Sequence, residues 1–385
     1  MIGKGLYIMS KRDIILTKNH QITGTKDSST NVFIYNSHGP RFNVDWLVRN
    51  MVINDGLFVI QDENKVLSDA VNRVLDKKNY FTINIDCAAP AESLKINPFD
   101  LVQDTADIHM LFTNILFALW DNEDLDMKAM SYLIDAFASS VFYMFADNKS
   151  KRTLRTMVNM MKAINASCTI NNKTVPMYEA LFTDNPNPDW MPKKYYMQFV
   201  EAAADEKDVV AQKVYNIFKQ IPESVLAMTD ATDATLGASL HFKTAFIINS
   251  NTMEERAYSK IVLSLLISLI ESSEMHLPAV VVSQLDSDKL IMGLPRWMQN
   301  SGKNNIDYII FANELQAFVP SYLKKQYLTN VKKFVDATMM IHRNKEAEEA
   351  EATLEEEDLQ VFHSSEYVAT LKVPALGIST DDEVF

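Results

Sequence analysis

The chain has 385 residues, 47% of them hydrophobic, so it can bury a sizeable core and is not a disordered chain. Its two cysteines, Cys87 and Cys168, lie far apart, which excludes a disulfide scaffold or a cysteine-rich metal site and fits a reducing cytoplasm. The longest apolar-rich run, Ile261 to Ile270, is too short to span a bilayer, so a soluble intracellular protein is expected.

The formal net charge of −13 is concentrated near the C-terminus. Residues 345–385 contain 12 acidic and two basic residues, a net charge of −10, which leaves −3 for the other 344 residues. Neither part has the clustered basic excess that a nucleic-acid-binding surface requires. The sequence therefore predicts a nearly neutral body followed by an acidic C-terminal tail.

A strand, a loop, a helix and a second strand follow one another between Asn31 and Leu67. The apolar run Asn31–Tyr35 predicts the first strand and Leu57–Gln61 the second, with a helix that ends near Asn50 between them. This order is the frame of a P-loop nucleotide-binding core. A nucleotide site on this frame would lie in the loop formed by Asn36, Ser37, His38, Gly39, Pro40, Arg41 and Phe42.

This loop lacks the side chains with which P-loops bind phosphates. Such loops use several glycines to wrap backbone N–H groups around the phosphates, a lysine to neutralise charge, and Ser or Thr to hold Mg²⁺. Here Gly39 is the one glycine, Pro40 removes a backbone N–H, and no lysine occurs between Lys26 and Lys65. The sequence therefore predicts the frame without its nucleotide chemistry, and no bound cofactor.

Strand and helix patterns continue to alternate on both sides of a helical block. After an amphipathic helix at Lys65–Lys78, strands are predicted at residues 80–85, 244–248, 279–282, 308–311 and 337–341, which indicates a mostly parallel sheet. Helical periodicity fills residues 104–227. We expect a discontinuous α/β domain at 1–103 and 228–344, an inserted all-α domain at 104–227, and the acidic tail at 345–385.

Several segments carry a resemblance to a known family. They are the strand Asn31–Tyr35 with its loop, the strand ending at Gln61, Ile96-Asn97-Pro98-Phe99, Leu226–Asp230, and Leu277–Val282 ahead of Ser283-Gln284. Over about residues 20–342, their order and spacing resemble the TraG-like coupling proteins of bacterial type IV secretion and conjugation, in the cytoplasmic form common on mobile elements of Gram-positive bacteria. Members of that family are RecA-like motor ATPases with an inserted all-α domain. The resemblance thus implies an α/β, RecA-like P-loop fold with a mostly parallel sheet and such an insertion.

The catalytic positions of that family carry different residues here. Its phosphate loop falls on residues 36–42 without a lysine, an aspartate after the second strand falls on Gln61, and an Asp-Glu pair falls on Ser283 and Gln284. Amide and hydroxyl side chains cannot act as an anionic base or as ordinary Mg²⁺ partners. These departures predict an inactive relative of a P-loop ATPase with no catalytic residue.

Other residues have two interpretations. Arg41 is either a phosphate contact or a surface arginine. His38 could bind phosphate or a metal ion, but no second histidine lies at the helical or hairpin spacing that a metal site needs. Asp286 and Asp288 replace the lost carboxylates or belong to an ordinary loop. The densest basic cluster contains Lys149, Lys151, Arg152 and Arg155. It is either a contact for DNA or an acidic partner, or a solvated helix start.

Three functions remain after this comparison. The favoured one is a pseudo-ATPase that acts as a binding or assembly component, with other conjugation or secretion proteins, including a coupling ATPase, as its partners. The second is a DNA-translocating or substrate-recruiting ATPase with unusual nucleotide ligands, and the third is a purely structural unit of a DNA-pumping ring. The expected location is the cytoplasm or the membrane face of a secretion complex, and the oligomeric state is left open.

Overall fold

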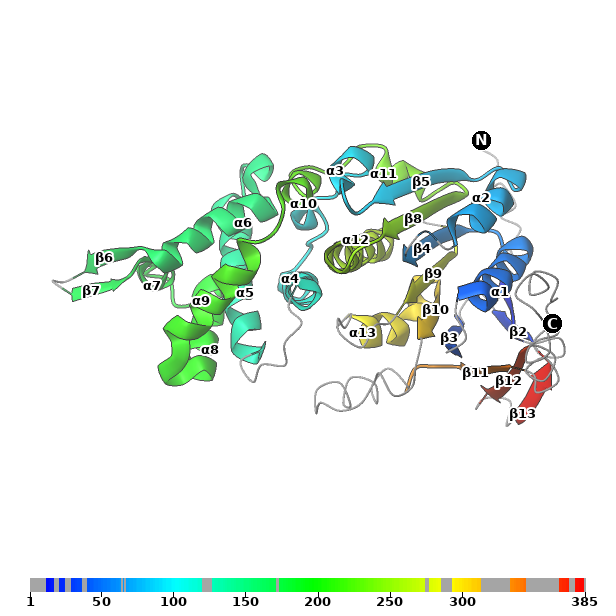
Figure 1. Ribbon diagram of the computed structural model, residues 1–385. Coiled ribbons are helices and arrows are strands. Elements are labelled where there is room, and N and C mark those ends of the chain that lie inside the picture. The colour runs from blue at the N-terminus through cyan, green and yellow to red at the C-terminus, as the bar shows by residue number, and fades with distance from the viewer. Residues whose placement is uncertain are drawn as a thin grey trace, which may run out of the picture.

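A nine-stranded β-sheet forms the centre of the α/β part of the molecule (Figure 1). The computed structural model describes residues 12–16, 21–24, 29–36, 40–63, 65, 67–119, 127–170, 173–273, 277–284, 293–312, 333–343, 367–373 and 378–383. From one edge to the other, the strands are β13 (Ile378–Glu383), β12 (Tyr367–Val373), β11 (Ala337–Arg343), β3 (Asn31–Asn36), β10 (Ile306–Ala312), β9 (Ala279–Gln284), β4 (Leu57–Glu63), β8 (Thr244–Ser250) and β5 (Phe81–Asp86).

The strands from β11 to β5 run parallel to one another, whereas β12 and β13 are antiparallel additions beyond β11. Parallel neighbours need long crossover connections, and helices supply them here. The observed sheet confirms the predicted α/β class with a mostly parallel sheet.

The pleat of the strands divides the core into two layers. In β4, Leu57 and Val59 belong to one buried cluster, and Phe58 and Ile60 belong to the other. Because helices cover both faces, every residue of β4 is buried, which explains its continuous apolar run. The helices α1 (Pro40–Ile53) and α2 (Ser68–Lys77) cover one face, and α12 (Met253–Ser272) covers the other, with α4 (Thr105–Leu119) packed against α12.

Shorter elements complete the α/β part. The hairpin of β1 (Arg12–Ile15) and β2 (Gln21–Gly24) packs beside α1, where the indole N–H of Trp46 donates to the carbonyl of Leu16 at 3.3 Å. The short helices are α3 (Pro90–Ser93), α11 (Leu236–Ser239), α13 (Leu294–Gln299) and α14 (Ser301–Asn304), with a 3₁₀ turn at Pro98–Asp100.

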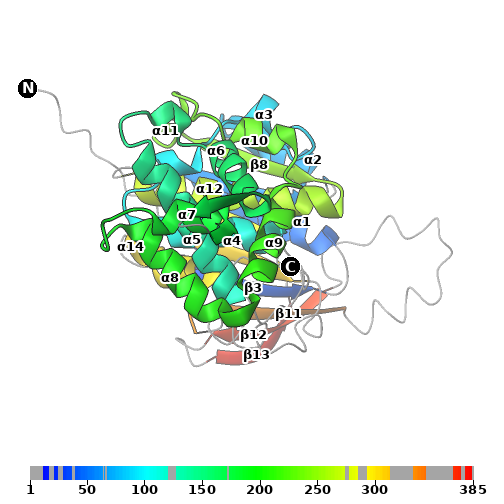
Figure 2. The ribbon, with the colours of Figure 1, turned by 90° about the vertical axis from the view of Figure 1, so that its left-hand side faces the viewer.

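The helical block lies beside the sheet and continues its core (Figures 1 and 2). Buried side chains of this block and of one sheet face form a single hydrophobic cluster. Beyond α4, the block contains α5 (Met127–Met144), α6 (Leu154–Met161), α7 (Met177–Thr183), α8 (Met191–Ala203), α9 (Lys207–Phe218) and α10 (Glu223–Met228), with 3₁₀ turns at Lys149–Lys151, Lys162–Asn165 and Ala204–Glu206.

The prediction that residues 104–227 are purely helical needs a correction. Strands β6 (Ser167–Ile170) and β7 (Lys173–Pro176) form an antiparallel hairpin in this block. The hairpin is a separate two-stranded sheet and does not join the main sheet. Four-residue strands are too short to reveal their period in a sequence. The division of the chain into an α/β domain and an inserted domain stays a prediction.

The prediction of a separate acidic tail after residue 344 is also wrong in part. Strand β12 pairs antiparallel with β11 over six residues, from Thr338–Lys372 to Arg343–Tyr367, and β13 pairs with β12. Backbone hydrogen bonds to the existing sheet therefore stabilise strands whose side-chain pattern gives a weak signal. The remainder of the predicted tail, residues 344–366, 374–377 and 384–385, lies outside the described residues.

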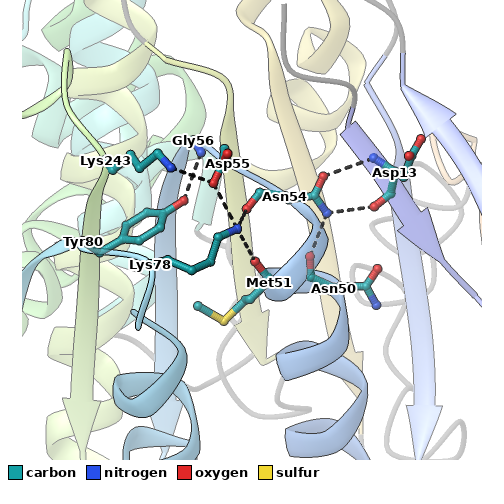
Figure 3. A network of polar contacts seen from close by, with 9 residues as sticks. All are labelled: Asp13, Asn50, Met51, Asn54, Asp55, Gly56, Lys78, Tyr80 and Lys243. Atoms are coloured by element: carbon teal, nitrogen blue, oxygen red, sulfur yellow. Dashed lines mark hydrogen bonds and ion pairs between the residues drawn. The ribbon is translucent and has the colours of Figure 1, made fainter. Parts of the chain in front are cut away.

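A polar network joins the loops at the amino edge of the sheet (Figure 3). Oδ1 of Asp55 accepts contacts from Nζ of Lys78 at 3.0 Å and Nζ of Lys243 at 2.9 Å. Burial raises the pKa of Asp55, but the hydrogen bonds from the two lysines outweigh it, so the net pKa lies below its usual value. The carboxylate thus connects the segments that precede β4, β5 and β8.

Two neighbouring contacts extend this network in Figure 3. The N–H of Gly56 donates to the hydroxyl of Tyr80 at 3.1 Å. On the opposite side, the amide of Asn54 bonds to both the N–H and the carbonyl of Asp13, at 3.1 and 2.8 Å. The N-terminal hairpin is therefore attached to the same edge of the sheet.

Candidate functional site

The carboxyl ends of the parallel strands meet at the opposite edge of the sheet, where open α/β sheets bind their ligands. Strand β3 ends at Asn36 and α1 begins at Pro40, which confirms the predicted strand followed by a helix, although Asn36 and residues 40–42 of the predicted loop belong to these two elements. Proline suits a first helical position, because the N–H there has no partner within the helix. Ser37, His38 and Gly39 lie outside the described residues, as do the side chains of Asn36, Pro40 and Arg41.

Gln61 and Ser283 meet at this edge. The Ser283 hydroxyl donates to Oε1 of Gln61 at 2.7 Å, and Nε2 of Gln61 donates to Oγ of Ser259 at 2.8 Å. Gln61 is completely buried, so its amide needs these partners. Gln284 is the last residue of β9, and its side chain lies outside the described part. This bonded group is neutral and replaces charged carboxylates with an amide and hydroxyls.

The sequence analysis missed two carboxylates directly after Gln61. Strand β4 continues to Glu63, two residues beyond its predicted end, so Asp62 and Glu63 are buried at the same edge. Oδ1 of Asp62 accepts the N–H of Leu67 at 2.9 Å, and Oε2 of Glu63 lies 3.3 Å from Nε of Arg256. Adjacent acidic residues at a strand end usually indicate a solvated loop, so their burial could not be expected from the local pattern.

Helix α12 and strand β8 add further buried polar groups. Asp62 and Glu63 pair with Asn249 and Ser250 of β8, and both β8 side chains are buried. Lys260 follows Ser259 on α12 and is only 1% exposed. We call the following residues the carboxyl-edge cluster: Gln61, Asp62, Glu63, Asn249, Ser250, Arg256, Ser259, Lys260 and Ser283.

The carboxyl-edge cluster contains both signs of charge in a buried setting. Arg256 and Lys260 are cations of the kind that contact phosphate, and Asp62 and Glu63 supply carboxylate oxygens. No group of three or more His, Cys, Asp or Glu side chains that could hold a metal ion occurs among the described residues. A magnesium ion at this edge would therefore take most of its ligands from nucleotide phosphates and water, as Mg²⁺ commonly does in nucleotide sites.

The predicted basic cluster lies elsewhere, in the helical block, and two of its members have structural partners. Arg152 donates to the carbonyls of Phe145 and Ala146 at 2.9 and 2.8 Å, near the end of α5. Nη2 of Arg155 lies 2.7 Å from Oδ2 of Asp230. Lys149 and Lys151 are exposed in the 3₁₀ turn between α5 and α6. A partner contact by this cluster would thus depend chiefly on the two lysines.

No protein-family model and no curated protein matches the chain. Solved structures do match it, and they define its class as a RecA-like fold of the kind found in conjugative coupling proteins. One of them is the unbound conjugative coupling protein TrwB, with 10% identity and a TM-score of 0.57 over 85% of this chain and 72% of that chain. TrwB with ADP and Mg²⁺, and TrwB with the GTP analogue GDPNP, match with 10% and 11% identity. Both have TM-scores of 0.54 and cover 92% of this chain and 77% and 78% of theirs.

These structures overturn the prediction that the chain is an inactive relative of a P-loop ATPase. TrwB has this fold and was solved with ADP and Mg²⁺ and with GDPNP. The prediction rested on motif residues that the sequence lacks. The buried Asp62 and Glu63 remove part of that argument, since the site does contain carboxylates.

None of the helices in the described part of the chain is long and apolar enough to cross a bilayer.

Proposed function

We propose that this protein is a binding or assembly component of a bacterial conjugation or type IV secretion system. The observation that carries the proposal is the match to TrwB over 85% of the chain. Its partners are other proteins of that system, including a coupling ATPase, and its place is the membrane face of the secretion complex. The match extends over most of the chain and is not limited to a common nucleotide-binding core.

The host cell offers a direct test. Deleting the gene should abolish transfer of the mobile element, and a tagged full-length chain should purify together with components of the secretion complex. A double change, Lys149→Glu and Lys151→Glu, should weaken that association if an acidic partner contacts the helical block. Lys162→Glu, an exposed lysine outside the turn, is the matched control. Unchanged transfer after deletion would refute the proposed function.

A second candidate function is nucleotide binding at the carboxyl edge with ligands unlike those of standard P-loops. Two buried carboxylates and two cations at this edge favour it, since carboxylates and cations are the groups that bind Mg²⁺ and phosphate. Here Arg256 or Lys260 takes the role of the absent loop lysine, and Asp62 or Glu63 that of the absent Mg²⁺ carboxylate. Arg41, at the start of α1, is the other cation near the loop.

Calorimetry with Mg-ATP, Mg-GTP and Mg-ADP on the full chain tests this second function. We expect Kd values of about 100 µM or tighter, with affinity reduced about tenfold or more in Arg256→Gln and Glu63→Gln. Glu223→Gln, a carboxylate of α10 remote from the site, should bind like the wild type. If no nucleotide binds while the wild type is folded, nucleotide binding is excluded and the assembly function stands alone.

A further inference from the structure

A small polar pocket lies between α4 and the helices α12, α13 and α14, near the amino edge of the sheet and thus opposite the carboxyl-edge cluster. Helix α12 starts after the carboxyl end of β8 and ends before β9 begins, and α14 ends just before β10. The C-terminal ends of both helices therefore lie near the amino edge of the sheet. The pocket has a volume of about 170 Å³ and is formed by the C-terminal end of α12, by α13 and α14, and by the start of α4. Leu101 and Leu111 provide its apolar wall. Its size suits a molecule of a few heavy atoms.

Two cations, Arg296 and Lys303, lie at the mouth of the pocket. Arg296 of α13 and Lys303 of α14 are exposed, and neither forms a salt bridge with another described residue. The nearby carboxylate of Asp107 is already engaged, because its Oδ2 accepts the N–H of Gln103 at 2.9 Å and of Asp104 at 3.2 Å. The pocket therefore presents positive charge that its own carboxylates do not neutralise by contact.

Ser268 on the inner wall is a buried hydroxyl without a partner. Serines within helices normally donate to a carbonyl of the preceding turn. Ser264 does so to Lys260 at 2.8 Å, and Ser272 does so to Leu269 at 2.9 Å. Oγ of Ser268, one turn from each, is buried and has no hydrogen-bond partner among the described residues. Since an unsatisfied buried hydroxyl is costly, its position in the pocket wall indicates a missing acceptor.

Glu271 lines the same pocket and has a raised pKa. Its Oε1 accepts a hydrogen bond from Nδ2 of Asn304 at 2.6 Å. Burial raises the pKa of Glu271 to about 7, and nearby Asp107 raises it as well, whereas Asn304, Arg296 and Lys303 act in the opposite direction. The hydroxyl of Tyr308 on β10 is also close enough to be influenced by Glu271. Near neutral pH, Glu271 thus carries a proton part of the time and can donate it in a hydrogen bond.

We propose that this pocket binds a small oxyanion, held by Arg296 and Lys303 at its mouth and by the hydroxyl of Ser268 inside. Each of these groups donates to oxygen, and the two cations favour a ligand with negative charge. The ligand is free in solution or is the terminal phosphate, sulfate or carboxylate group of a small molecule. Because α4 belongs to the helical block and α12 to the α/β part, the ligand links the two.

Sulfate is the best first probe, because it stays a dianion over the pH range in which Glu271 titrates. Calorimetric titration of the full chain with sulfate should show saturable binding, tighter by about tenfold at about pH 6 than at about pH 8. The sign follows from Glu271, whose negative charge above its pKa repels the anion. In Glu271→Gln, which resembles the protonated state, binding at about pH 8 should equal binding at about pH 6. A comparison with acetate distinguishes a tetrahedral from a carboxylate group.

Variants locate the site. Arg296→Gln and Lys303→Gln should each weaken sulfate binding about tenfold, whereas Lys162→Gln should not change it. Binding that is lost in Arg41→Gln or Arg256→Gln but kept in Arg296→Gln would place sulfate at the carboxyl edge and overturn this inference, while it would support nucleotide binding there. Absence of saturable binding, or a pH dependence that survives in Glu271→Gln, would also overturn it. Melting curves of each variant confirm that it is folded.

Discussion

Ser283 donates its hydroxyl hydrogen to Oε1 of Gln61 across 2.7 Å, which joins residues that are 222 positions apart in the sequence. Together with the bond from Gln61 to Ser259, this contact connects β9, β4 and α12 at the carboxyl edge of the sheet. The amide N–H of Gln61 donates to one hydroxyl and its carbonyl oxygen accepts from the other, so both ends of this neutral side chain are hydrogen-bonded. The bond explains why Gln61 tolerates complete burial.

The first prediction concerns this buried amide. Gln61→Leu should lower the free energy of unfolding by about 1–3 kcal/mol, because the Ser283 and Ser259 hydroxyls lose a buried partner. Denaturant unfolding followed by circular dichroism measures it. Gln198→Leu, on the exposed side of α8, should shift stability by less than about 0.5 kcal/mol. Equal effects of the two changes would show that the Gln61 bonds do not contribute to stability.

The second prediction concerns Gly56, which has a φ of +153° before β4. A Cβ at this position would lie 2.2 Å from the carbonyl oxygen of Pro278, which is backbone and cannot rotate away. Gly56→Ala should therefore destabilise the protein by about 2–4 kcal/mol. Gly237→Ala is the matched control: a Cβ there meets nothing within 4 Å, so the change in α11 should be neutral or stabilising by up to about 1 kcal/mol. Thermal unfolding of both variants compares them.

The third prediction concerns a pair in the helical block. Nδ1 of His109 on α4 lies 2.6 Å from Oδ2 of the buried Asp135 on α5. The hydrogen bond that protonated His109 donates to Asp135 raises the pKa of His109 above 6.5. Protonated His109 therefore stabilises the folded state. This contribution to the free energy of unfolding is fully present below pH 6.5 and is lost as the pH rises through the raised pKa of His109. Histidine resonances in an NMR titration should show a raised pKa that falls in Asp135→Asn, and an unshifted pKa would contradict the pairing.

The fourth prediction concerns the C-terminal strands. Removing residues 346–385 deletes β12 and β13, so β11 becomes an edge strand with unpaired backbone groups. We expect the Tm to fall by more than about 5 °C, measured by scanning calorimetry. Removing Val384 and Phe385 alone leaves both strands intact and should not change the Tm. A truncated chain with the Tm of the wild type would show that β12 and β13 add nothing to the stability of the sheet.

Local patterns in the sequence were sufficient for the α/β class and for most strands and long helices. The runs at Asn31–Tyr35, Leu57–Gln61 and Ala279–Val282 predict buried parallel strands, because a strand covered on both faces must be apolar throughout. Thr252 lies directly before α12, and its side chain accepts the N–H of Glu255 at 3.2 Å, a capping pattern that is local in the sequence. These signals arise from contacts within a few residues of the chain, so they can be recognised without the fold.

The tertiary structure alone decided which distant groups meet. Nothing near Asp62 and Glu63 in the sequence indicates burial, since their setting depends on β8 and α12, about 190 residues away. Strands β12 and β13 were missed because β12 pairs with the distant β11, β13 pairs with β12, and their own side-chain pattern is mixed. The pocket around Ser268 and Glu271 likewise combines α4, α12, α13 and α14. Local periodicity reports which face of an element is buried, whereas a site depends on the long-range packing that brings several elements together.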